Sequence, residues 1–186
     1  MLEDLDTGFG MILDKIDELG IKENTYVIFT SDNGGGFRGN APLQMGKADL
    51  WEGGIRVPTI VRGPNVLRNQ YCDVPIAGWD FYPTVSEIIG NPKRLPSEFD
   101  GGSLVSVFEN GNAGEVIRNT EALIFHFPWF NGEPESAIRL GDYKLIKNID
   151  SRKTWLFDVS KDIEESNDLS DAMPAKANEL EKLLSC

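Results

Sequence analysis

The sequence is poor in the residues that build disulfide scaffolds and thiol or imidazole metal sites. Among its 186 residues it has two cysteines, Cys72 and Cys186, and one histidine, His126. Two cysteines this far apart provide neither a disulfide framework nor a metal-binding spacing. The sequence also lacks an apolar run long enough for a membrane helix, and no signal peptide is recognisable in it. These absences exclude a disulfide-stapled fold, a zinc-finger-type domain and a membrane span within this sequence.

Basic residues are scarce as well. The sequence has 18 Lys and Arg residues and 30 Asp and Glu residues, which gives a formal net charge of −12. This balance argues against general binding to nucleic acids or to anionic membranes. It leaves an anionic small substrate open, because charges more than about 8 Å apart are largely screened. The hydrophobic content of 40% and the ten Phe residues are typical of a globular chain, with one domain or one domain and a small appendage.

The apolar pattern of the first part of the chain predicts an α/β fold. Residues 2–19 carry apolar side chains three and four positions apart, as in an amphipathic helix, and Gly20 stands where its C-terminal cap is expected. Residues 25–30 are β-branched or aromatic and almost all apolar, which predicts a strand buried on both faces. Residues 56–61 predict another strand and residues 80–89 another helix. This order favours a partial parallel or mixed sheet flanked by helices.

The last part of the chain has a different pattern, which predicts a small antiparallel sheet. Its short apolar and β-branched runs are typical of strands, and they lie at residues 122–127, 136–140, 143–147 and 155–157. Residues 175–184 predict a closing helix that packs on this sheet. We therefore expect two domains, an α/β part over residues 1–118 and an antiparallel β subdomain with a terminal helix over residues 119–186.

The densest polar motif is Thr30-Ser31-Asp32-Asn33-Gly34-Gly35-Gly36, directly after the first predicted strand. The Asp32 carboxylate and the Asn33 amide offer hard oxygen ligands of the type that calcium and magnesium prefer. Ligand sites of open α/β sheets gather at the carboxyl ends of strands, where this pair is expected to lie. Asp, Asn and Gly also favour turns whatever the function, so a plain Asx turn stays open as the alternative.

A second dense segment runs from Gly46 to Pro58 and reads Gly-Lys-Ala-Asp-Leu-Trp-Glu-Gly-Gly-Ile-Arg-Val-Pro. Its adjacent glycines permit backbone angles or close approaches that a Cβ would forbid. Lys47 follows Asn33 by fourteen positions (47 minus 33), so the loop between them could fold its ammonium back over the oxygen pair. An ammonium 4 Å from an anion is worth about 4 kcal/mol at an effective dielectric constant of 20. The alternative is a solvated surface lysine, because lysines are rarely buried.

Taken together, the two segments resemble the sulfatase family of the alkaline phosphatase-like superfamily. The resemblance rests on residues 30–34, 46–47 and 51–58. It covers nearly the whole chain and continues in Asp80 to Gly90, Asp100-Gly101-Gly102-Ser103-Leu104, Ala137-Ile138-Arg139, Gly141 to Ile146, Trp155-Leu156-Phe157-Asp158 and Asn167-Asp168-Leu169.

The resemblance implies roles for individual residues. Asp32 and Asn33 match the family positions that complete a calcium site, and the Asp32 position lies close to the nucleophile. Lys47 matches the lysine that contacts the sulfate group, so we expect it to be both catalytic and substrate-binding. Sulfate-ester cleavage builds negative charge on the leaving oxygen, which a divalent cation and a fixed ammonium stabilise. For Arg56 a structural partnership with the glycine turn is favoured over a sulfate clamp, because anion-binding arginines usually converge in groups.

His126 has two interpretations. It lies between Phe125 and Phe127 in a predicted strand, and a single histidine in that setting is more often packed than catalytic. The resemblance implies that the C-terminal subdomain can border the substrate pocket, so a substrate contact by His126 stays open as well.

The sequence departs from the family pattern at the nucleophile. Sulfatases depend on a cysteine or serine in a Cys/Ser-x-Pro-x-Arg motif, which is oxidised to formylglycine. In Cys72-Asp73-Val74-Pro75 the proline comes one place too late, and no serine meets the pattern. The other calcium ligands, the catalytic histidines and a first lysine belong to an N-terminal half that this sequence does not contain. We therefore expect the C-terminal portion of a sulfatase, inactive alone and with weak or no affinity for calcium.

Two other functions remain open at this stage. A phosphodiesterase or phosphonate hydrolase of the same superfamily shares the metal-centred anion chemistry, although Lys47 and the Glu52 to Pro58 segment favour a sulfatase. A non-catalytic remnant would self-associate through an exposed sheet edge and an uncovered apolar face. The expected substrate is a sulfate ester of a small molecule or carbohydrate, without a nucleic-acid or membrane partner. A periplasmic or extracellular location follows only from the habit of the family.

Overall fold

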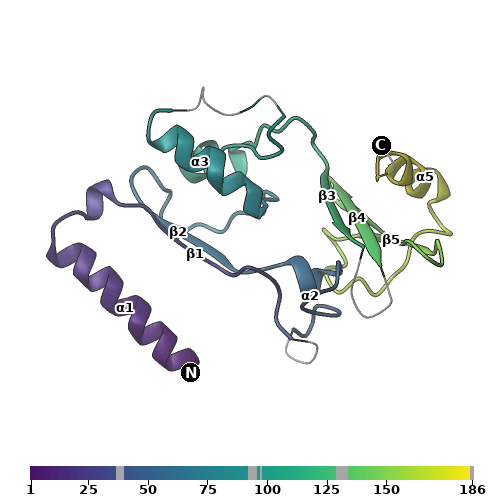
Figure 1. The fold of residues 1–186 in the computed structure, drawn as a ribbon, viewed down its shortest axis with the longest axis horizontal. Coiled ribbons are helices and arrows are strands. Elements are labelled where there is room, and N and C mark those ends of the chain that lie inside the picture. The colour runs from purple at the N-terminus through teal and green to yellow at the C-terminus, as the bar shows by residue number, and fades with distance from the viewer. Residues whose placement is uncertain (37–39, 92–95, 97, 129–133, 185–186) are drawn as a thin grey trace. The chain divides into compact units, whose positions relative to one another are not determined.

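The computed structural model describes residues 1–36, 40–91, 96, 98–128 and 134–184 (Figure 1). Contacts within the chain divide it into two compact units. Unit 1 comprises Met1–Thr30, Pro58–Ser97 and Gly101–Val116, and unit 2 comprises Ser31–Val57, Glu98–Asp100 and Ile117–Cys186. Both dense sequence motifs therefore belong chiefly to the unit that contains the C-terminal sheet. The predicted domain division between residues 118 and 119 stays a prediction.

Unit 1 contains most of the helices and one pair of strands. Its elements are α1 (Leu2–Glu18), η1 (Lys22–Asn24), β1 (Val27–Thr30), β2 (Thr59–Arg62), η2 (Gly78–Asp80), α3 (Phe81–Ile88), α4 (Val105–Asn110) and η4 (Gly111–Ala113). The predicted helices and strands of this part are present, and Gly20 follows α1 with a φ of 68°, as its cap position requires. None of the described helices is both long enough and apolar enough to cross a membrane.

The two strands of unit 1 pair with each other. β1 and β2 are antiparallel, with Val27 opposite Arg62 and Thr30 opposite Thr59, and within the described residues they form a two-stranded sheet. The predicted mixed α/β class is confirmed, but the prediction that the first strand is buried on both faces was wrong. β1 is half-buried up to its exposed last residue, rather than buried on both faces. A strand buried on both faces needs neighbours and helices on each side, and the described residues give β1 one partner strand.

A buried carboxylate fixes the start of α3. Asp80 is fully buried, and its carboxylate accepts hydrogen bonds from the backbone N–H groups of Ala77 at 2.7 Å and Gly102 at 3.0 Å. Thr84 Oγ1 donates to Asp80 O at 2.6 Å and accepts from Leu104 N–H at 2.8 Å. These bonds satisfy backbone donors that burial would otherwise leave without partners. They join α3 to the loop that precedes α4.

Unit 2 is built on an antiparallel sheet. Its elements are α2 (Glu52–Ile55), β3 (Leu123–Phe127), β4 (Glu135–Leu140), β5 (Tyr143–Asn148), β6 (Thr154–Asp158) and α5 (Pro174–Leu184). The strands follow one another in the order β3-β4-β5-β6, so each pairs with its neighbour in sequence. The predicted short strands and the closing helix are confirmed, and Gly141-Asp142 forms the turn between β4 and β5.

The register of this sheet assigns each side chain to one of two faces, because directly paired residues share a face. One face carries the paired row Ile124, Ile138, Leu145 and Leu156. This face packs against Leu180 of α5. The opposite face carries the next row, Phe125, Ala137, Ile146 and Trp155. It packs against Trp51, directly before α2. The sheet therefore has an α5 face and an α2 face.

Candidate functional site

The Asp-Asn motif forms a turn directly after β1. Ser31 Oγ donates a hydrogen bond to Asn33 O over 3.0 Å, which is typical of turns built by short polar side chains. Asp32 is exposed and Asn33 is half-buried. This bond comes from Ser31 and not from the Asp32 or Asn33 side chain, so the Asx turn stays an alternative. The Asp32 side chain is accessible.

Backbone hydrogen bonds connect this turn to the Lys47 loop. Lys47 N–H donates to Gly35 O over 2.8 Å, and Asn40 Nδ2 donates to the same oxygen over 2.8 Å. Asn40 Nδ2 also lies within hydrogen-bond distance of Met45 O, at 3.2 Å. The Lys47 side chain itself is exposed. The structure thus brings together the backbones of the two motifs that we singled out in the sequence.

The glycines of both motifs are required by close packing. Gly34 N–H donates to Gly54 O at 2.8 Å, and Gly53 N–H donates to Gln44 O at 2.9 Å. A Cβ on Gly34 would lie 1.9 Å from Gly53 O, and a Cβ on Gly54 would lie 2.1 Å from Asp49 O. No side chain fits at these distances, so glycine is needed for the close approach of the segments.

The backbone on either side of Gly46-Lys47 is left-handed. Met45 has a φ of 58° and Ala48 has a φ of 78°. A residue with a side chain costs about 1–2 kcal/mol in this region. Such a conformation persists only when the surrounding structure determines it. The Lys47 loop is therefore held by tertiary contacts rather than by its local preferences.

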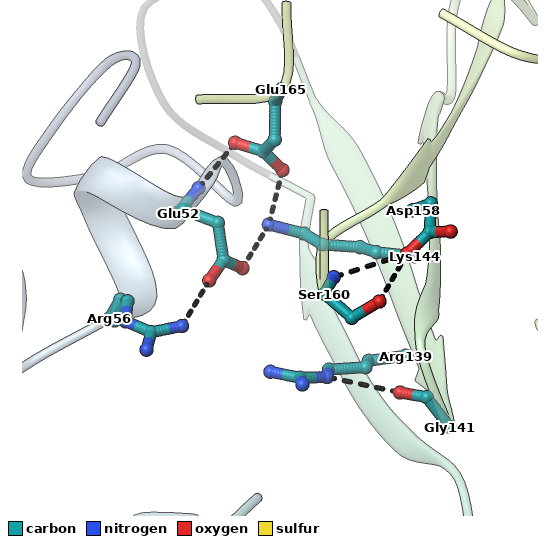
Figure 2. Close-up of polar contacts among 8 residues, drawn as sticks. All are labelled: Glu52, Arg56, Arg139, Gly141, Lys144, Asp158, Ser160 and Glu165. Carbon is teal, nitrogen blue, oxygen red and sulfur yellow. Dashed lines mark hydrogen bonds and ion pairs between the residues drawn. The ribbon is translucent and has the colours of Figure 1, made fainter. Parts of the chain in front are cut away.

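Three buried charged side chains from distant segments meet at α2 (Figure 2). Lys144 Nζ of β5 donates to Glu52 Oε1 over 2.9 Å and lies 2.8 Å from Glu165 Oε1. Glu165 Oε2 accepts a hydrogen bond from Glu52 N–H at 2.7 Å. Only 1% of the Lys144 side chain and 3% of the Glu52 side chain are exposed, and Glu165 is 0% exposed. We call these three residues the Lys144 cluster.

The two carboxyl groups of the Lys144 cluster have opposite pKa shifts. Burial acts to raise the pKa of Glu52, but the charge and hydrogen bond of Lys144, with the charges of Arg139 and Arg56, hold that pKa below its usual value. For Glu165 burial prevails over the attraction of Lys144, and the negative charge of Glu52 adds to it, so the pKa of Glu165 is raised. Glu165 is therefore the member of this pair that binds a proton first as the pH falls.

Replacing Glu165 by glutamine should change how stability depends on pH. Because the pKa of Glu165 is raised from 4.5, its stabilising contribution is present below pH 4.5 and is lost as the pH rises through its folded pKa. Glu52 has the opposite sign, and its contribution is lost as the pH falls through its lowered pKa. The wild type should therefore gain stability relative to Glu165→Gln as the pH falls from neutral toward 4.5, measured by urea unfolding at each pH. A difference that does not change with pH would contradict the shift.

Arg56 contacts the Glu52 carboxylate, and its partnership with the glycine turn stays a prediction. Its Nη1 lies 3.4 Å from Glu52 Oε2, and 45% of the Arg56 side chain is exposed. The Lys144 cluster itself was missed in the sequence, because its members are 92 and 113 positions apart. The available signal was Lys144 within an apolar strand, since lysines are almost never fully buried unless they are paired.

The register of the sheet assigns His126 to the α5 face. His126 lies on β3, at the edge of the sheet, and its Nδ1 is 2.6 Å from Ser136 Oγ of β4. The two residues are directly paired and belong to the α5 face. Trp51 packs on the opposite face. The substrate contact of His126 stays a prediction.

The oxygen pair fits a part of a calcium site. Asp32 and Asn33 supply one charge and two oxygen-bearing side chains, whereas calcium takes six to eight oxygens. The part of the chain that the structure describes contains no group of three or more His, Cys, Asp or Glu residues able to hold a metal ion. Asp32 and Asn33 alone therefore do not complete a calcium shell.

Two solved structures share the fold of this chain over part of their own length. The structure of BT4656 in complex with its substrate D-glucosamine-2-N,6-O-disulfate matches 99% of this chain and 38% of its own, with a TM-score of 0.82 and 26% identity. Ps i-CgsB, solved in complex with k-i-k-neocarrahexaose, matches 100% of this chain and 41% of its own, with a TM-score of 0.85 and 25% identity.

Sequence comparison agrees with the structural match. The sulfatase family model matches residues 1–91. A sulfatase of Formosa agariphila is 36% identical over 173 residues, which are 84% of this chain and 31% of that protein. Human steryl-sulfatase is 36% identical over 138 residues, which are 68% of this chain and 23% of its own length. The chain belongs to the sulfatase family, and it spans about a third or less of these two relatives.

Proposed function

We propose that this chain supplies the C-terminal share of a sulfatase active site. Asp32 and Asn33 contribute oxygen ligands to a calcium ion, and Lys47 contacts the sulfate group of the substrate. The observation that carries the proposal is the hydrogen bond from Lys47 N–H to Gly35 O, at 2.8 Å, which holds the lysine loop against the turn with the oxygen pair. In the proposed site the calcium ion and the Lys47 ammonium would both lie near the sulfate group.

Each proposed residue has a defined chemical part. A bound calcium ion would supply positive charge that stabilises the oxygen atoms of the sulfate group. Lys47 would bind the same group as a point charge, since an ammonium is a compact donor with three N–H bonds. Its exposed side chain keeps that charge available to a ligand. The nucleophile would come from a Cys/Ser-x-Pro-x-Arg motif, which these 186 residues lack.

The proposed substrate is a sulfate ester. BT4656 was solved with a disulfated glucosamine as its substrate, Ps i-CgsB was solved with a neocarrahexaose, and the human relative is named steryl-sulfatase. The glucosamine disulfate and the steryl sulfate implied by the name of the human relative have the sulfate group in common. This is the group that Lys47 would contact. Sulfated carbohydrates and steroid sulfates are therefore the two classes to try first.

The isolated chain of 186 residues should have neither sulfatase activity nor tight calcium binding. Two oxygen ligands with one charge fall far short of a complete calcium shell, and without a nucleophile the covalent step is missing. Calorimetry should show no micromolar calcium binding, and an aryl sulfate should remain intact. Micromolar binding, or hydrolysis that Lys47→Ala abolishes, would contradict this expectation.

A chimera tests the proposed function itself. The segment of the Formosa agariphila sulfatase that matches this chain would be replaced by residues 1–186, so that the remainder supplies the nucleophile and the other ligands. A folded chimera should hydrolyse an aryl sulfate that the parent enzyme hydrolyses, and chelation of calcium should stop the reaction. A folded but inactive chimera, with calcium present, would count against the proposal.

A further inference from the structure

The Lys144 cluster is not among the residues that the proposed function uses, although burying its charges costs free energy of folding. Glu52, Lys144 and Glu165 come from α2, β5 and the segment after β6, and their side chains are almost fully buried. Burying charges is costly, and hydrophobic residues of similar volume often stabilise a protein as well or better. General stability alone therefore does not explain the cluster. The geometry of α2 indicates that the cluster fixes the position of this helix.

The position of α2 depends on this cluster. α2 has 4 residues, and a helix this short is not stable by itself. Glu165 Oε2 accepts the N–H of Glu52 at its first residue, and Lys144 Nζ binds the carboxylate of the same residue. Figure 2 shows Lys144 Nζ between the two carboxylates, with Glu52 joined to both partners. Trp51 adds an apolar contact to Phe157, with ring centroids 5.3 Å apart.

Hydrogen bonds to the glycine carbonyl groups of α2 connect this helix to the candidate site. Gly54 O accepts from Gly34 N–H at 2.8 Å, directly after the Asp32-Asn33 turn. Gly53 O accepts from Asn40 Nδ2 at 2.9 Å, and the same side chain holds Gly35 O, the acceptor of the Lys47 N–H. These segments are in close contact, so a displacement of α2 must also displace the Asp32-Asn33 turn and the Lys47 loop.

We infer that the Lys144 cluster positions the candidate site: Glu52, Lys144 and Glu165 fix α2, and through its glycines they hold the turn with Asp32 and Asn33 and the loop with Lys47. They are positioning residues, since none of them is proposed to touch the substrate. The inference rests on the proposed function for what the loops do, but not for how the loops are held.

Amide hydrogen exchange of the 186-residue chain, measured by NMR, tests this inference without any substrate. In Lys144→Met the amides of Gly34, Lys47 and Gly53 should exchange at least tenfold faster, while amides of the β4–β5 ladder change less. Glu165→Ala should have the same local effect. Glu165→Gln should accelerate the loop amides less than Glu165→Ala does, because its one side-chain oxygen can still accept the Glu52 N–H although its NH2 group then faces Lys144 Nζ.

Lys147→Met is the matched control. Lys147 lies on the same strand β5 but on the α5 face, where its Nζ pairs with Glu181 Oε1 at 2.7 Å. Its loss should leave the loop amides unchanged. The inference is overturned if Lys144→Met accelerates loops and ladder by the same factor, or if Lys147→Met accelerates the loops equally. It is also overturned if Glu165→Ala and Glu165→Gln behave alike, a comparison that holds even if Lys144→Met does not fold. An inactive folded chimera would overturn the proposed function alone.

Discussion

Lys144→Met is expected to lower the free energy of unfolding by about 3–5 kcal/mol, the range found when one partner of a buried ion pair is removed. Methionine fills a similar volume, so little of the loss would come from packing. The loss comes instead from Glu52 and Glu165, which would remain buried side by side without their common cation. Arg56 cannot replace Lys144, because it reaches only Glu52 and is 45% exposed.

Urea unfolding at pH 7 measures this effect, with Lys147→Met as the control. The Lys147–Glu181 pair is partly exposed, at 25% and 37% of the two side chains, so its loss should cost about 0–1 kcal/mol. Adding Glu165→Gln to Lys144→Met should restore part of the lost stability, because one of the two uncompensated charges is then removed. Equal effects of Lys144→Met and Lys147→Met would show that the buried charges are not paired as the structure has them.

Lys47→Ala should lower kcat/KM of the active chimera by about 10²–10³-fold, the usual effect of removing one donor that stabilises developing charge. An ammonium at 4 Å from the sulfate oxygens would supply about 4 kcal/mol at an effective dielectric constant of 20. Stability should hardly change, because the Lys47 side chain is exposed and the backbone N–H to Gly35 O bond survives the substitution. Lys22→Ala, at another exposed lysine, should leave kcat/KM unchanged.

Local sequence patterns were sufficient to predict most of the elements. Helix α1 follows from the spacing of its apolar residues, and Gly20 from the need for a left-handed residue after the helix. The strands β3 to β6 could be predicted because hairpins are built from neighbouring runs of sequence, with turns such as Gly141-Asp142 between them. The pairing of β1 and β2 could not, because strand direction depends on partners far away in the chain.

The candidate site was predictable only in part, for the same reason. The motifs around Asp32 and Lys47 stand out because glycines and polar residues concentrate in them, and the structure joins their backbones through Gly35. The Lys144 cluster does not stand out, since each member looks like an ordinary charged residue until the fold buries it. His126 stands out as the one histidine of the sequence, but a strand places its residues alternately on two faces, and register alone decides which.

The most direct test of the central claim is the rate at which the chimera hydrolyses an aryl sulfate, with and without Lys47. We predict calcium-dependent hydrolysis by the chimera and a loss of about 10²–10³-fold in kcat/KM for Lys47→Ala, with both proteins folded to the same extent. A folded, active chimera whose kcat/KM is the same with lysine or alanine at position 47 would contradict it.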